Sequence, residues 1–78
     1  MMDKGTAKEL LHRMQSANRP PQSKAYWLGV FHALQYLLGE IGHLPQPFQQ
    51  GTPEQEAFRL GNMEGAVVAE EYLKEVSQ

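Results

Sequence analysis

The chain has 78 residues, a formal net charge of −2 and no cysteine. This length allows one domain, whose single core stabilises the fold by only about 3–5 kcal/mol. Because the missing cysteines exclude disulfides, thiolate metal sites and thiol nucleophiles, we expect oligomerisation to supplement the core.

The first predicted helix spans about residues 6–17. Thr6 and Glu9 have the spacing of a capping box, in which the threonine oxygen accepts the third helical N–H and the glutamate reaches back. A short apolar stripe follows, made of Leu10, Leu11 and Met14. Pro20 and Pro21 then end the helix, because proline has no N–H donor and restricts the residue before it.

The charge pattern gives this N-terminal segment a different character from the rest of the chain. Residues 1–24 carry five basic and two acidic side chains, a net charge of +3, whereas residues 25–78 carry two and seven, a net charge of −5. Clustered basic side chains favour phosphate backbones, so only the N-terminal segment is a candidate for binding nucleic acid. The candidate contacts are Lys4, Lys8, Arg13, Arg19 and Lys24. We therefore divide the chain into a basic arm with a loosely docked helix, residues 1–22, and a helical domain, residues 23–78.

The second predicted helix spans about residues 23–41, with Ser23 as its cap and either Gly39 or Gly42 as its end. Its apolar side chains extend around most of the circumference, which one neighbour in so short a chain cannot cover. We therefore expect a second subunit and predict a homodimer. The predicted dimer or partner interface consists of Trp27, Phe31, Leu34, Leu38 and the loop residue Phe48. Polar residues and glycine interrupt this apolar region and no signal peptide precedes it, so we expect a cytoplasmic protein that does not enter a membrane.

The third predicted helix spans about residues 52–76. Thr52 caps it, and Pro53 occupies the first helical position, where a missing N–H costs nothing. Acidic residues follow near the positive end of the helix dipole. The sequence thus predicts an all-α fold, a small helical hairpin plus a short N-terminal helix.

An internal repeat relates the two longer helices. Residues 25–33 align without gaps on residues 57–65, and each segment carries an aromatic side chain followed by small residues four apart. Residues four apart share a helix face, and small residues there let two backbones approach closely. The predicted contacts of such a crossing are Gly29, Ala33, Gly61, Gly65 and Ala69. The alternative is that these glycines only weaken their helices.

The repeat and the turn between its halves resemble the ribosome modulation factor family, the Rmf/CrpP-like proteins, over residues 25–69. The matching residues are Tyr26, Gly29, Ala33, Pro47, Phe48, Gly51, Thr52, Pro53, Glu54, Ala57, Phe58, Gly61 and Gly65. The resemblance implies a two-helix hairpin that binds the small ribosomal subunit and promotes inactive ribosome dimers. The founding member is strongly basic, whereas the matching part of this chain is acidic.

The sequence contains no recognisable catalytic or metal-binding constellation. His12, His32 and His43 lack the close spacing of metal sites on one helix. Glu70 and Glu71 are adjacent and diverge around a helix, so they do not form an acid/base pair. We therefore predict a protein that is not an enzyme and uses neither cofactor nor metal.

These observations predict a small regulatory binding protein that modulates or inhibits a protein partner through a helical surface, and a phage or plasmid origin fits such a protein. The alternative is a ribosome-associated modulation factor that binds the small subunit or ribosomal RNA through its basic arm.

Most aromatic side chains are predicted to be core residues, because their spacing suits helix packing. Phe48, on the turn, is the exception, since it either closes the end of the hairpin or projects into a partner.

Overall fold

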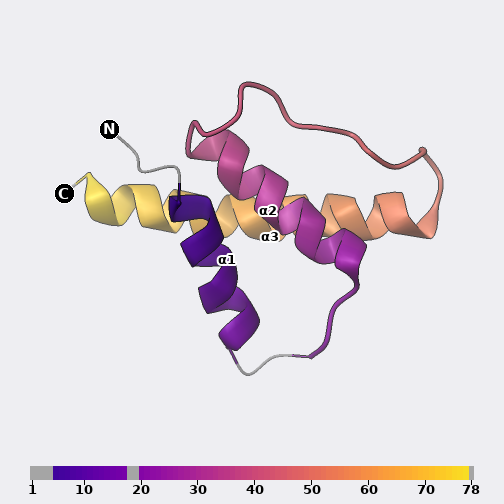
Figure 1. The fold of residues 1–78 in the computed structure, drawn as a ribbon, viewed down its shortest axis with the longest axis horizontal. Coiled ribbons are helices and arrows are strands. Elements are labelled where there is room, and N and C mark those ends of the chain that lie inside the picture. The colour runs from indigo at the N-terminus through magenta and orange to yellow at the C-terminus, as the bar shows by residue number, and fades with distance from the viewer. Residues whose placement is uncertain (1–4, 18–19, 78) are drawn as a thin grey trace.

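The computed structural model describes residues 5–17 and 20–77, which form three α-helices and no strand. The helices are α1 (Thr6–Ser16), α2 (Lys24–Leu37) and α3 (Pro53–Val76). Figure 1 shows α2 lying across the long α3, with α1 against this pair. The predicted all-α class is confirmed. None of these helices combines the length and the apolar character needed to span a bilayer.

The starts of α2 and α3 agree with the predicted caps. The Ser23 side chain accepts a hydrogen bond of 3.2 Å from the N–H three residues ahead. Thr52 does the same for the N–H of Gln55, at 3.1 Å, and Pro53 follows at the first helical position. Gly51, with a φ of 88°, supplies the left-handed turn that leads into this cap. Both starts are therefore encoded by a few adjacent residues.

α2 ends at Leu37, earlier than the predicted end at Ile41. The N–H of Glu40 donates to the carbonyl oxygen of Gln35 at 2.8 Å, which closes the last turn of the helix. Gly39 takes the left-handed conformation that this closure requires, with a φ of 80°. The glycine thus stops the helix and turns the chain into the following loop.

α1 begins differently from its prediction. Gly5 is the N-cap and provides no side chain to bond the helix, so the predicted capping box of Thr6 and Glu9 is wrong. Instead, the N–H of Ala7 donates to the carboxylate of Glu40 at 3.0 Å. An anion close to a helix N-terminus also interacts favourably with the helix dipole. The cap of α1 therefore comes from the segment that follows α2.

α2 and α3 run in the same direction, whereas a hairpin would place them antiparallel (Figure 1). Residues 38–52 carry the chain back along α2, whose 14 residues span about 21 Å. The contacts agree with this direction, since Gly29 lies against Phe58 and the later Ala33 lies near the later Gly65. The long connection makes this parallel arrangement possible.

All three helices share one hydrophobic core. Its buried side chains are Ala7, Leu10, Met14, Val30, Leu34, Leu38 and Ala69. Half-buried aromatic side chains pack around them, among them Trp27 and Phe31. α1 is therefore docked on the other two helices, and the predicted boundary after residue 22 separates it from them in sequence but not in packing.

Candidate functional site

α3 carries a row of exposed apolar side chains on the side turned away from α2. Leu60 is 47% exposed, Met63 57% and Val67 51%. Their spacing of three and four residues places them on one line along the helix. The opposite side of α3 is buried against α2 through Phe58, Gly61, Gly65 and Ala69. We call Leu60, Met63 and Val67 the α3 stripe, and no element of the described chain packs over it.

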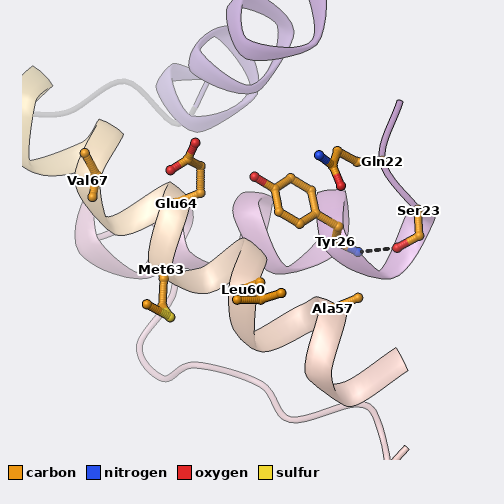
Figure 2. Close-up of a pocket in the computed structure, with 8 residues that line it drawn as sticks. All are labelled: Gln22, Ser23, Tyr26, Ala57, Leu60, Met63, Glu64 and Val67. Atoms are coloured by element: carbon orange, nitrogen blue, oxygen red, sulfur yellow. Dashed lines mark hydrogen bonds between the residues drawn. The ribbon is translucent and has the colours of Figure 1, made fainter. Parts of the chain in front are cut away.

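An open groove runs beside the α3 stripe and has a volume of about 510 Å³. Its lining residues are Gln22, Ser23, Tyr26, Ala57, Leu60, Met63, Glu64 and Val67. Figure 2 shows the Tyr26 ring reaching from α2 with Gln22 on one side and Glu64 on the other, while Leu60 and Met63 lie along α3. An apolar floor with a polar rim is typical of surfaces that bind proteins.

Charged side chains lie at both ends of the α3 stripe. Glu56 and Arg59 precede it, whereas Glu70 and Lys74 follow it, and all four are exposed. A guanidinium nitrogen of Arg59 lies 2.7 Å from a carboxylate oxygen of Glu56. This hydrogen-bonded pair lowers the pKa of Glu56 and raises the pKa of Arg59. Charged side chains therefore flank the apolar stripe at both of its ends.

The residues predicted to form the helix crossing, Gly29, Ala33, Gly61, Gly65 and Ala69, are all buried. The carbonyl group of Phe58 occupies the space that a Cβ on Gly29 would need, and that of Tyr26 does so for Gly61. A Cβ on Gly65 would lie 2.7 Å from a carbonyl oxygen of α2. Side chains larger than hydrogen at these positions would separate the two helices.

Two residues of the predicted dimer interface require a correction. Leu34 and Leu38 are 0% and 4% exposed and form part of the core of their own chain, so they do not face a partner. Trp27 and Phe31 are half-buried and pack against the same core. The reason is that α1 and α3 pack against the side of α2 that leads to these residues.

Phe48, the remaining residue predicted at an interface, lies on the loop that connects α2 to α3. The centroid of its ring lies 5.6 Å from that of the Phe58 ring, in an edge-to-face arrangement. The Phe48 side chain is half-buried. Edge-to-face aromatic pairs are favourable beyond the area that they bury. In this conformation Phe48 attaches the loop to α3.

Of the five basic residues predicted to contact nucleic acid, three lie in the part of the chain that the structure describes. Lys4 and Arg19 lie outside the described residues. Lys8 and Arg13 are exposed on α1, and Lys24 is exposed at the start of α2.

Two of these basic residues have acidic neighbours. Arg13 borders a cleft that Glu71 and Glu75 of α3 also line. Lys24 likewise borders a cleft that Glu54 lines. Carboxylates beside these cations weaken the attraction of a phosphate backbone.

His32 is the most enclosed of the histidines, packed with its ring 5.7 Å from that of Phe58. Burial lowers the pKa of His32 below its ordinary value of 6.5, because the imidazolium loses hydration. Its Nδ1 is buried without a hydrogen-bond partner, as is Oδ1 of Asn62. Among the described residues, no group of three or more histidine or acidic side chains is placed to hold a metal ion.

Comparison of the chain with protein-family models, curated proteins and solved structures finds no match. The resemblance to the ribosome modulation factor family therefore stays a prediction. The features that describe this protein are its three-helix architecture and the α3 stripe.

The α3 stripe was missed at the sequence level. The spacing of Leu60, Met63 and Val67 is visible in the sequence, but the prediction assigned the third helix one apolar side, which is the side buried on α2. The core of a small domain covers only one side of such a helix, so a second apolar side stays exposed. Counting both sides would have identified the stripe.

Proposed function

We propose that the chain is a small, non-enzymatic regulatory protein of the cytoplasm, which binds a protein partner through the α3 stripe and thereby modulates or inhibits that partner. The observation that carries this proposal is the set of large apolar side chains exposed in one row on α3. Contiguous exposed apolar side chains on a soluble domain mark interaction surfaces more often than scattered ones do.

The stripe is suited to this role because it is separate from the core. Leu60, Met63 and Val67 lie on the side of α3 opposite the α2 contact, and about half of each side chain stays exposed in the single chain. Full burial of such a side chain against a partner contributes about 1.5–3 kcal/mol. A partner that covers all three therefore gains a small apolar interface centre, with the flanking charges as its rim.

Ribosome association through the basic arm has weaker support. Arg13 and Lys24 each share a cleft with carboxylates of α3. Electrostatic attraction to RNA depends on many phosphates being neutralised at once, which this arrangement disfavours. We therefore treat RNA binding as an alternative outcome of the experiment below.

The proposal is tested by substituting Met63 at the centre of the stripe. The full chain, its Met63→Glu variant and a matched Gln15→Glu variant are immobilised and exposed to extract of the native host. Gln15 is exposed on α1, so its substitution adds the same charge away from the stripe. We expect the unmodified chain and Gln15→Glu to retain the same protein in stoichiometric amount, and Met63→Glu to lose it at least about tenfold.

Circular dichroism of the three chains checks that each has folded. Retention of the same protein by all three would contradict the proposal. Retention of ribosomal RNA alone, released by a high-salt wash, would support the ribosomal alternative instead, because phosphate contacts are salt-sensitive.

A further inference from the structure

The α3 stripe belongs to a longer line of exposed positions on the same helix. Successive members of the line are alternately four and three residues apart, which is the spacing of the core positions of a coiled coil. The line consists of Glu56, Leu60, Met63, Val67, Glu70 and Lys74, all of them exposed. Its centre is apolar, its first member is acidic and its last member is basic. Such a line is suited to packing against another helix.

We propose that a second copy of this chain covers the α3 stripe, with the two α3 helices packed antiparallel. This inference rests on the proposed function, since it takes the stripe as a protein-binding surface, and it adds that a second copy occupies the surface while no other partner is bound. The interface differs from the one predicted on α2, where Leu34 and Leu38 are buried in the core.

The line fits an antiparallel register centred on its apolar residues. In antiparallel coiled coils, the two kinds of core position face one another across the interface. The register with the greatest overlap places Met63 opposite Val67 of the second copy, and by symmetry the reverse. Leu60 then lies beside the aliphatic part of Glu70 of the second copy. Six apolar side chains, three from each copy, are buried at the centre of this arrangement.

Charge complementarity selects this register. It places Glu56 opposite Lys74 of the second copy at both ends of the interface. Arg59 is next to the line, and in this register it lies on the same edge of the interface as Glu70 of the second copy, which has the opposite charge. A parallel pair in register would instead place Glu56, Glu70 and Lys74 each opposite its own copy. Like charges across an interface disfavour that arrangement, so the antiparallel one is preferred.

The rest of the molecule leaves room for the second helix. The crossing with α2 is on the opposite side of α3, through Gly61 and Gly65. Glu64 lies off the line, at the rim of the groove beside Tyr26 (Figure 2). A partner that binds the same stripe must displace the second copy, so self-association competes with regulation of that partner.

The experiment is sedimentation equilibrium of the full chain over a range of concentrations. The Glu56→Lys and Lys74→Glu variants each place like charges at both ends of the antiparallel dimer. We expect each to raise the dimer dissociation constant about tenfold, and the double variant Glu56→Lys/Lys74→Glu to restore it. Met63→Glu should abolish the dimer, because it puts charge at the apolar centre.

Matched controls carry the same charge changes away from the line. Glu75→Lys on α3 and Lys8→Glu on α1 alter exposed positions and should leave the dissociation constant unchanged. A dimer that is insensitive to Met63→Glu, or to both single charge reversals, would overturn the inference. A chain that stays monomeric at every concentration would also overturn it, while the proposed function would survive if Met63→Glu still lost its captured protein.

Discussion

Gly29 and Gly61 lie at equivalent positions of the internal repeat and meet the opposite helix in equivalent ways. Gly29 lies against the carbonyl group of Phe58, and Gly61 against that of Tyr26. Each glycine thus contacts the aromatic residue that lies three positions before the other glycine. This reciprocity is an approximate twofold relation between α2 and α3, and the contact of the later Ala33 with the later Gly65 shows that the two helices run in the same direction.

Substitution of Gly61 by alanine is expected to destabilise the protein by about 1–3 kcal/mol, because the added Cβ would collide with backbone atoms that cannot move independently. Alanine gains about 1 kcal/mol of helix propensity over glycine, which is too little to offset the collision. Gly42→Ala is the control, since a Cβ there meets nothing within 4 Å. The free energy of unfolding in urea measures both. A Gly61→Ala variant as stable as the unmodified chain would contradict the close crossing.

His32 is expected to make stability depend on pH. Its pKa in the folded chain lies below the ordinary value of 6.5, since burial disfavours the charged ring. The unfolded chain therefore takes up a proton first as the pH falls. The contribution of His32 to stability is fully present above its ordinary pKa and is lost as the pH falls from there towards the lowered pKa.

The measurement compares the unmodified chain with His32→Phe, which keeps a ring beside Phe58 but cannot titrate. Urea unfolding at about pH 7.5 and about pH 5.5 should show a larger loss of stability in the unmodified chain than in the variant. Equal losses in the two chains would exclude His32 as the titrating group.

At the scale of elements, α1 is attached by its apolar side and by its N-terminus. Leu10 and Met14 enter the core formed with α2, and the Ala7 N–H is capped by Glu40 from the next connection. A short isolated helix is only marginally stable in water, so these tertiary contacts determine whether α1 forms. The basic segment is consequently part of the folded unit from residue 5 to residue 17.

Glu40→Ala is expected to lower the free energy of unfolding by about 1 kcal/mol, the usual cost of removing an N-cap acceptor. Glu9→Ala should cost only a few tenths of a kcal/mol, because Glu9 is exposed and acts through the helix dipole alone. Amide hydrogen exchange, read at the residues of α1, checks where the loss occurs. A loss as large for Glu9→Ala as for Glu40→Ala would support the local capping box that the sequence predicted.

For the whole molecule, the position of the uncovered apolar surface determines the proposed function. The apolar circumference of α2 predicted a second subunit, but the side that carries Val30 and Leu34 is buried within one chain by α1 and α3. The α3 stripe supplies three exposed large apolar side chains in one row, whereas Tyr36 and Leu37 at the end of α2 are exposed as a separate pair. The expectation of a homodimer is kept as a proposal, with its interface moved from α2 to α3.

The sequence alone determined the features that depend on neighbouring residues. The caps at Ser23 and Thr52 and the small residues of the crossing follow from local hydrogen bonding and from the helical period. The glycine stop at Gly39 is equally local, and the sequence left Gly39 and Gly42 as alternative ends of the helix. Such features need no knowledge of the rest of the fold.

Only the tertiary structure decided which way α2 and α3 run, how α1 is capped, and which side of α3 stays exposed. The glycine rows permit close approach in either direction, and the long connection through residues 38–52 decides between them. The bond from Ala7 to Glu40 joins residues far apart in sequence, which no local pattern predicts. Both sides of α3 carry apolar residues, and burial of one leaves Leu60, Met63 and Val67 for another molecule because a helix can present only one side to α2.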